Sequence, residues 1–165
     1  MAASIDLQIV PLDQIEGCNI ILGTAHFIKT VEDLYETIVS TVPNVHFGLA
    51  FCEASGPRLI RCEGTDKTLV NAAKENALKL RCGHSFIIYL KNAFPINVLN
   101  QIKLVPEVCS IHAATANPIQ VLVAETHQGR GIIGVIDGQS SQGVETDEER
   151  THRIKFIRNI GYKVQ

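Results

Sequence analysis

The chain has 165 residues, of which 45% are hydrophobic and 19% are charged, and its formal net charge at pH 7 is -2. This length and composition fit one globular domain with a substantial core, and they exclude a disordered chain. A slightly acidic chain also lacks the basic excess with which general nucleic-acid binders neutralise phosphates. We therefore expect a single domain over residues 1–165 that has no nucleic-acid partner.

The compartment follows from three further features. No apolar run approaches the roughly 20 residues that a transmembrane helix needs, and the first residues lack the basic segment and apolar block of a signal peptide. The five cysteines are widely spaced and odd in number, which favours a reducing compartment. Cys109 and His112 are close in sequence, but on a strand they would point to opposite faces. We expect a cytoplasmic protein with no membrane partner and no metal site.

Strands are predicted where short apolar runs occur. Residues 5–10 alternate between apolar and polar and are typical of an edge strand, whereas five other runs are almost continuously apolar. Such runs are typical of strands that are covered on both faces. They span residues 19–22, 47–51, 86–90, 119–124 and 132–136, and a further strand is expected near residues 108–114.

Four helices are predicted from their ends. Thr30 could cap the first, the second begins near Asp66, and the third begins at Pro95, a residue that suits the first helical position. The fourth opens with a capping box formed by Thr146 and Glu149. Helices between apolar strands predict parallel crossovers, and short turns join the last three strands. We therefore expect an α/β fold with a mixed, mostly buried sheet, about four flanking helices and a C-terminal antiparallel meander.

Several polar residues follow the predicted strands directly. Ligands of open α/β sheets bind beyond the carboxyl ends of parallel strands, near helix N-termini. If the strands are parallel, one edge of the sheet collects His26, Lys29, Glu53, Ser55, Asn92, Asn97, Asn117 and Asp137, with Ser140 in the loop after Asp137. Each residue also has a structural interpretation, such as an asparagine that bonds its own backbone at a turn. The convergence of all of them predicts a functional site.

Two glycine motifs bear on phosphate binding. Residues 23–30 nearly fit G-x-x-x-x-G-K-[ST], but Ile28 replaces the second glycine, so a nucleoside-triphosphate loop is disfavoured. An anion site made by Lys29 and the first helix's amides remains open. Residues 129–134 match G-x-G-x-x-G without a following helix, which favours a hairpin turn. We expect this turn and His84 at the opposite edge, so that Arg130 could join the site only across a subunit interface of a homo-oligomer.

Long blocks of the sequence resemble one known family. They span residues 26–35 (HFIKTVEDLY), 47–56 (FGLAFCEASG), 92–99 (NAFPINVL), 114–118 (ATANP) and 125–134 (ETHQGRGIIG). These blocks are similar to those of the adenosine-specific kinase family, and the resemblance runs from about residue 5 to Tyr162. It implies binding of adenosine or AMP and a phosphorylated histidine intermediate. The matching blocks offer His26 and, alternatively, His84 for that histidine.

The first hypothesis is an adenosine phosphotransferase. Phosphoryl transfer depends on positioning and positive charge, so Lys29 could hold the phosphate while His26 carries it or deprotonates the ribose. Glu53 or Asp137 would orient the histidine or hold a magnesium ion that accompanies the unidentified phosphate donor. Asparagines and Ser55 could bind the nucleoside, with Phe94 stacked on adenine. The alternative hypothesis is a non-catalytic adenosine or AMP sensor that uses the same pocket.

Overall fold

The computed structural model of the chain describes residues 4–164. Within these residues it contains eight strands and four helices. Their order is β1 (Asp6–Pro11), β2 (Cys18–Ala25), α1 (Thr30–Thr41), β3 (His46–Cys52), β4 (Ile60–Gly64), α2 (Lys67–Leu80), β5 (Ser85–Lys91), α3 (Pro95–Leu104), β6 (Val108–Thr115), β7 (Ile119–Glu125), β8 (Arg130–Asp137) and α4 (Asp147–Asn159). The predicted α/β class with four helices is confirmed.

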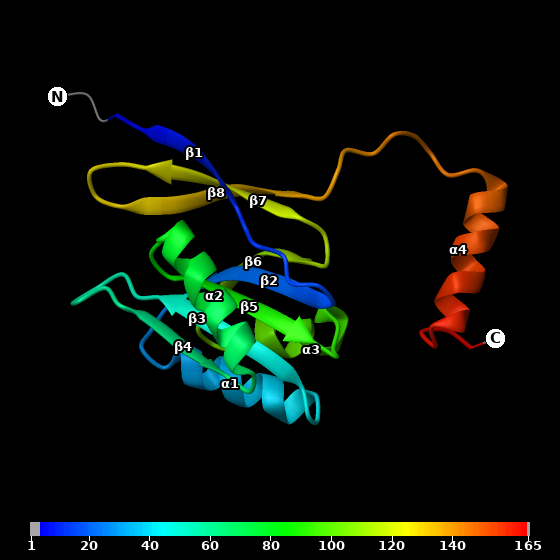
Figure 1. Ribbon diagram of the computed structural model, residues 1–165, viewed down its shortest axis with the longest axis horizontal. Helices are drawn as coiled ribbons and strands as arrows, with labels where there is room; N and C mark the ends of the chain where they lie inside the picture. The colour runs from blue at the N-terminus through cyan, green and yellow to red at the C-terminus, as the bar shows by residue number, and fades with distance from the viewer. Residues whose placement is uncertain (1–3, 165) are drawn as a thin grey trace.

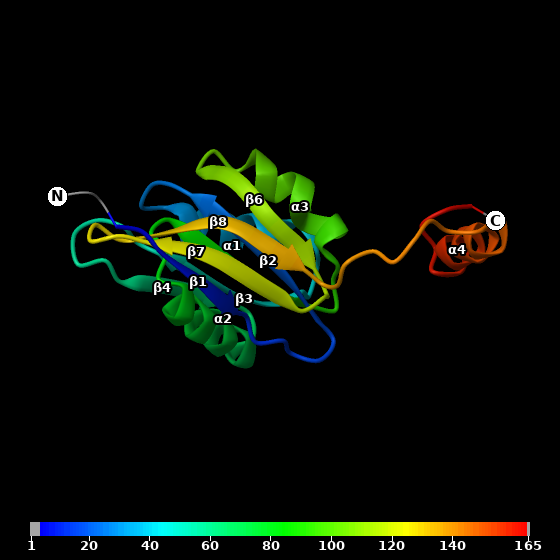
Figure 2. The same ribbon diagram turned by 90° about the horizontal axis from the view of Figure 1, so that it is seen from above.

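The strands form two sheets. The larger has the order β4-β3-β5-β2-β6 and the smaller the order β1-β7-β8. Helices α1 and α3 cover one face of the larger sheet, and α2 and the smaller sheet cover the other (Figures 1 and 2). The larger sheet is therefore the central layer of the body.

Each face of the larger sheet contributes to its own apolar core. Side chains alternate between the faces along a strand, so Ile21 and Ile88 pack against α1 and α3, whereas Leu22 and Ile87 pack toward α2 and the smaller sheet. Tyr89 is fully buried among the second group and donates its hydroxyl to the carbonyl of Asp13 at 2.5 Å. This double burial explains why β2, β3 and β5 are almost continuously apolar.

The predicted mixed sheet is wrong, because every strand pairing in the described residues is antiparallel. Helices α1 and α3 do join strands of the same direction, β2 to β3 and β5 to β6, but an antiparallel strand lies between the members of each pair. Strands β2 and β3 run in the same direction, but β5 lies between them and runs against both. The expected meander is partly wrong as well. Strands β7 and β8 form the predicted hairpin, but β6 pairs with β2, and β1 pairs with β7 as an edge strand.

Three of the four predicted helix starts are confirmed. Asp66 caps α2 through its side chain, Pro95 is the first residue of α3, and Thr146 forms a capping box with Glu149. The prediction for Thr30 is wrong. Thr30 is the first residue of α1, and its hydroxyl donates to the carbonyls of His26 and Phe27. It therefore fixes the preceding loop and does not cap the helix.

Helix α4 stands apart from the rest of the molecule. It lies at the end of an extended segment, residues 138–146, and is separated from the body in both views (Figures 1 and 2). None of its residues is buried, so it contributes nothing to the core of its own chain.

Gly48 determines how closely α2 approaches β3. A Cβ atom at Gly48 would lie 2.0 Å from the backbone carbonyl carbon of Leu69 and 2.1 Å from the amide nitrogen of Val70. Both neighbours are backbone atoms, so the clash would be relieved only by displacing the helix. Any side chain at this position would therefore separate α2 from the sheet.

We predict that Gly48→Ala lowers the free energy of unfolding by about 3 kcal/mol, because α2 must shift away from its packed position. Gly129→Ala is the matched control, since a Cβ there has nothing within 4 Å. Urea denaturation followed by circular dichroism measures both variants. Equal stability of the two variants would contradict the close approach.

Candidate active site

Antiparallel pairing decides which residues meet at the edge where β2 and β3 end. Because β5 and β6 run against β2, they begin at this edge. The edge therefore brings together the loop after β2, the loop after β3, and residues that precede β5 and β6. We call it the site edge, and its polar side chains are His26, Lys29, Glu53, Ser55, Arg61, His84 and Glu107.

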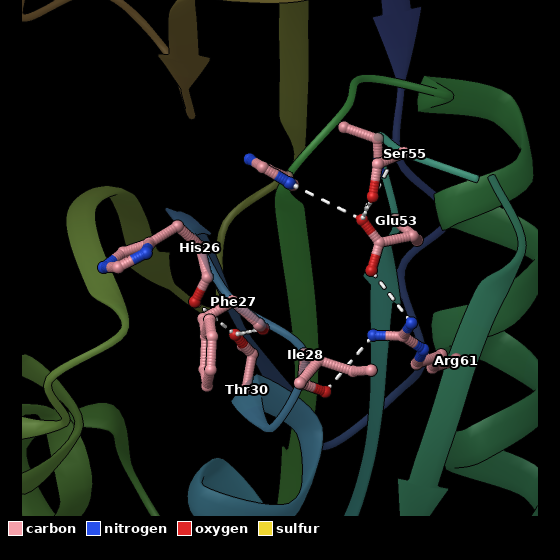
Figure 3. A network of polar contacts seen from close by, with 9 residues as sticks. His26, Phe27, Ile28, Thr30, Glu53, Ser55 and Arg61 are labelled. Atoms are coloured by element: carbon pink, nitrogen blue, oxygen red, sulfur yellow. Dashed lines mark hydrogen bonds and ion pairs between the residues drawn. The ribbon is translucent and has the colours of Figure 1, made fainter.

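Glu53 is the centre of the polar contacts at the site edge (Figure 3). Its Oε1 accepts hydrogen bonds from the amides of Ala54 (2.9 Å) and Ser55 (3.2 Å) and from the Ser55 hydroxyl (3.0 Å). Its Oε2 lies 2.9 Å from Nη2 of Arg61. The carboxylate is thus held in place by one loop and one neighbouring strand.

These contacts determine the charge of Glu53. Its side chain is 11% exposed, and burial alone would raise its pKa. The bonds from the Ala54 and Ser55 amides and the Ser55 hydroxyl outweigh burial, and together with the Arg61 charge they lower the pKa of Glu53 below its usual range. Glu53 is therefore an anion at neutral pH.

His84 lies against this anion, with its Nε2 3.6 Å from Oε1 of Glu53. The imidazole ring is stacked on Phe51, with ring centroids 5.9 Å apart and planes 14° apart. The backbone of His84 has a φ of 62°, in the left-handed region that non-glycine residues seldom occupy. Such strained positions cluster at functional sites. The prediction that His84 lies at the opposite edge is wrong, because β5 is antiparallel to β2.

His26 lies in the loop after β2, on the opposite side of the site edge from Glu53 (Figure 3). The imidazole of His26 is exposed and turned away from Glu53, while its backbone N–H donates to the carbonyl of Glu107 at 2.8 Å. Phe27 follows with a φ of 81° and a ring that is 58% exposed. Arg61 donates to the carbonyl of Ile28 at 3.2 Å, so the same guanidinium holds both Glu53 and this loop.

Lys29 is already paired. Its Nζ contacts the carboxylate of Asp33 and lies 2.6 Å from Oε1 of Glu107. Its hydrogen bonds to Asp33 and Glu107 raise the pKa of Lys29, and the bond to Asp33 has the larger effect. Glu107 is 2% exposed, and its Oε2 is buried without a hydrogen-bond partner among the described residues. Two carboxylates thus match the Lys29 charge, and an anion placed beside it would meet their repulsion.

A basic cleft adjoins Glu53 on the side of the smaller sheet. It has a volume of about 1230 Å³ and lies between the β3–β4 loop, the end of α2 and the turn that joins β7 to β8. The charged residues that line it are Glu53, Arg58, Lys74, Arg81 and Arg130. Four cations thus surround one acid. A smaller hollow of about 420 Å³, between α1 and α3, contains none of the predicted site residues.

Arg130 belongs to this cleft within a single chain, which corrects the prediction that it could join the site only across a subunit interface. Its side chain is 8% exposed. Nη2 donates to the side-chain oxygen of Gln8 at 2.8 Å, and Nε lies 3.6 Å from a carboxylate oxygen of Glu125. The guanidinium therefore ties the start of β8 to β1 and β7.

The other predicted residues lie at the opposite edge, and the prediction that one edge collects all of them is wrong. Asp137 accepts hydrogen bonds from Thr115 and Asn117, both at 3.0 Å. Asn92 accepts from the amide of His46, and Asn97 accepts from the amide of Phe94. These contacts give Asp137 and the three asparagines structural partners. Phe94 and Ser140 are exposed at that side of the molecule.

Sequence reasoning missed Arg61, Glu107 and three cations of the cleft. Arg61 faces Phe51 across the β3–β4 pairing, so an antiparallel hairpin at residues 46–64 would have placed it beside Glu53. An acid between Val105 and Val108, just before a strand, was the available signal for Glu107. Arg58 comes from the β3–β4 loop, whereas Lys74 and Arg81 come from α2 and its C-cap, and only the fold brings the loop and the helix together.

Two negative findings apply to the described residues. Within residues 4–164, no group of three or more histidine, cysteine, aspartate or glutamate side chains is arranged to hold a metal ion. Over the same range, none of the helices combines the length and the apolar character needed to cross a membrane.

Two comparisons with known proteins return a match. The family model described as "Adenosine specific kinase" matches residues 10–163. The crystal structure of the PH1918 protein from Pyrococcus horikoshii OT3 is similar with a TM-score of 0.94 and 43% sequence identity, covering 98% of this chain and 100% of that one. No curated protein matches the chain.

We predict that Glu53→Gln destabilises the fold by about 2 kcal/mol at neutral pH, because Arg61 and two amides lose an anionic acceptor. A lowered pKa means that Glu53 contributes stability above the ordinary glutamate pKa of 4.5 and loses it as pH falls through the lowered value. The difference in the free energy of unfolding between the parent and Glu53→Gln should therefore become smaller at acidic pH.

Urea unfolding at about pH 7 and about pH 3 measures this difference. Glu63→Gln, on the adjacent strand β4, is the control, because it removes an exposed carboxylate for which the described residues provide no hydrogen bond. A deficit of equal size at both pH values would refute the assignment of the ionised contact to Glu53.

Proposed function

The chain belongs to the adenosine-specific kinase family, and from this premise we propose that it binds adenosine or AMP and transfers a phosphoryl group at the site edge. The observation that carries the proposal is the contact of His84 with an ionised carboxylate, Glu53, that also lines a cleft with four cations. A histidine oriented by a carboxylate is a recurrent arrangement for nucleophiles and proton carriers.

His84 is the better-supported phosphate carrier. With Nε2 facing Glu53, Nδ1 is the nitrogen left to attack phosphorus. In the first step, the Nδ1 lone pair forms a P–N bond while the bond from phosphorus to the donor's leaving oxygen breaks. In the second step, a ribose hydroxyl of adenosine attacks the phosphorus, the P–N bond breaks, and the hydroxyl proton passes to a base. Glu53 stabilises the positive charge that the ring acquires when the P–N bond forms.

The cleft is the better-supported phosphate site. Phosphoryl transfer is promoted by positive charge around the phosphate oxygens, and Arg58, Lys74 and Arg81 offer three cations from two elements. Lys29, the residue predicted from sequence, is matched by Asp33 and Glu107. We therefore propose that the phosphate lies on the cleft side of Glu53.

Phe27 replaces Phe94 as the proposed stacking partner for adenine. Both rings are 58% exposed, but only Phe27 lies at the site edge. Its strained backbone is held by Thr30, whose amide and hydroxyl both donate to the Phe27 carbonyl. His26, its neighbour, is the proposed base for the ribose hydroxyl, since an imidazole accepts a proton near neutral pH.

A magnesium ion that arrives with the phosphate donor would be held mainly by the donor's own phosphates. Glu53 is the acid nearest the cleft, but both of its oxygens already have partners, and Asp137 lies at the opposite edge. We propose no dedicated metal ligand. Assays with nucleoside triphosphates, pyrophosphate and polyphosphate identify the donor.

The second candidate function is a non-catalytic adenosine or AMP sensor. It is supported by the fact that binding needs only the cations of the cleft and an exposed aromatic ring, and both are present without any role for a histidine. A labelled donor separates the two functions, because only the kinase acquires or transfers phosphate.

We predict that His84→Asn abolishes phosphoryl transfer and the acid-labile label from a 32P-labelled donor, while adenosine affinity measured by calorimetry changes less than about threefold. Asparagine keeps a hydrogen bond but cannot carry phosphate. His26→Asn should keep the label and slow transfer to adenosine, and His152→Asn on α4 is the control.

Labelling of His84→Asn at the parent level would refute His84 as carrier. Adenosine binding with no label or turnover from any donor would favour the sensor.

We also predict that Lys74→Ala and Arg81→Ala each weaken AMP binding about tenfold relative to adenosine, because only AMP carries the charge that these residues attract. Lys29→Ala should change the ratio of AMP affinity to adenosine affinity less, and Lys103→Ala, on α3, should leave that ratio unchanged. Calorimetric titration with both ligands gives the ratios. A larger effect of Lys29→Ala would indicate that the phosphate binds at the start of α1.

A further inference from the structure

The outer face of the smaller sheet is apolar and uncovered. In the strand register, Leu7 faces Ala124 and Ile9 faces Leu122, so these four side chains share one face. Leu7 is 68% exposed and Ile9 is 62% exposed. Strand β8 adds Ile133 and Ile136, which are 60% and 45% exposed. Together these six residues form what we call the outer face.

The opposite side chains of the same strands already form part of the core. Val121 and Val123 are fully buried, and Val10, Ile132 and Val135 pack against the same cluster. Strands β7 and β8 therefore carry apolar side chains on both sides, as strands covered on both faces do, and β1 adds Leu7 and Ile9 to the outer side. Their own chain covers only the inner side. A contiguous apolar patch of this kind marks an interaction surface.

Helix α4 also carries apolar side chains that its own chain leaves uncovered. Ile154, Phe156, Ile157 and Ile160 fall within about half of the helix circumference at 3.6 residues per turn, and none of them is buried. An isolated helix of 13 residues is marginally stable in water. The helix therefore needs an apolar surface against which to pack.

The charged residues of α4 and of the smaller sheet lie outside the proposed apolar contact. Residues 150–158 of α4 carry Arg150, Lys155 and Arg158 in addition to Arg153, which pairs with Glu145, and contain no acid. Strands β1, β7 and β8 carry Asp6, Glu125 and Asp137 at their ends. Their one basic residue, Arg130, is 8% exposed and packs inward. These three acids alternate with Leu7, Ala124 and Ile136 and therefore point to the inner side of the sheet, where Glu125 contacts Arg130 and Asp137 contacts Asn117. The contact between α4 and the outer face is therefore apolar, and the basic side chains of α4 meet no charge on that face.

We propose that α4 of one copy packs its apolar side on the outer face of a second copy. Residues 138–146 lead α4 away from the sheet of its own chain (Figures 1 and 2), which places it to reach a neighbour. Each copy offers one helix and one face, so the contact repeats from copy to copy and closes into a ring or a reciprocal pair. The proposal is independent of the kinase function.

The test uses two full-length variants. The face variant combines Leu7→Lys with Ile9→Lys, and the arm variant combines Ile157→Glu with Ile160→Glu. None of the four substituted residues belongs to the core clusters of the described residues, so both variants should keep the circular dichroism spectrum of the folded body. Ile96→Lys, at an equally exposed position on α3, is the control.

Sedimentation equilibrium should show assemblies for the parent chain and for Ile96→Lys, and monomers of 18.1 kDa for each variant alone. An equimolar mixture of the two variants should give a species of twice that mass, because the intact arm of one can dock on the intact face of the other. A monomeric parent chain, an arm variant that assembles like the parent, or a mixture that stays monomeric would each overturn the proposal.

Discussion

The position of β5 between β2 and β3 is the constraint on which the site depends. Strand β5 pairs with both neighbours in the antiparallel sense, so its first residues fill the space between the two strand ends. The backbone of His84 bonds to both sides: its N–H donates to Cys52 at 2.7 Å, and its carbonyl accepts from Ala25 at 2.9 Å. The sheet itself therefore sets the imidazole beside Glu53, and the loops only complete the surroundings.

Charge is divided between two parts of the site edge. On the α1 side, Lys29 meets Asp33 and Glu107, and the region has no net positive charge to offer a ligand. On the α2 side, cations outnumber acids in the cleft. Glu53 stands at the boundary and is neutralised by Arg61. This division is the basis for proposing that a phosphate binds on the α2 side and a nucleoside on the α1 side.

The sequence predicted what local patterns encode. Apolar runs located the strands, and the signals at Asp66, Pro95 and Thr146 located three helix starts, because capping is a short-range interaction. Strand direction is not local, since an apolar run reads the same in either direction. Because the strands were assumed to be parallel, His84 and Arg130 were predicted at the wrong edge of the sheet. For the same reason, Asn92 and Asp137 were assigned to a site that they do not reach.

The buried guanidinium of Arg130 has a mechanical consequence. It contacts Gln8 on β1, Glu125 on β7 and the carbonyl of Lys79 in α2, so three elements of the fold are joined to β8 at one side chain. The β7–β8 turn cannot swing outward as a flap without breaking these contacts. In the β3–β4 loop, by contrast, the side chains of Arg58 and Leu59 are exposed and have no such anchor within the described residues. If the cleft binds the proposed ligands, differences in ligand length would be accommodated by that loop, because the opposite wall is fixed by Arg130.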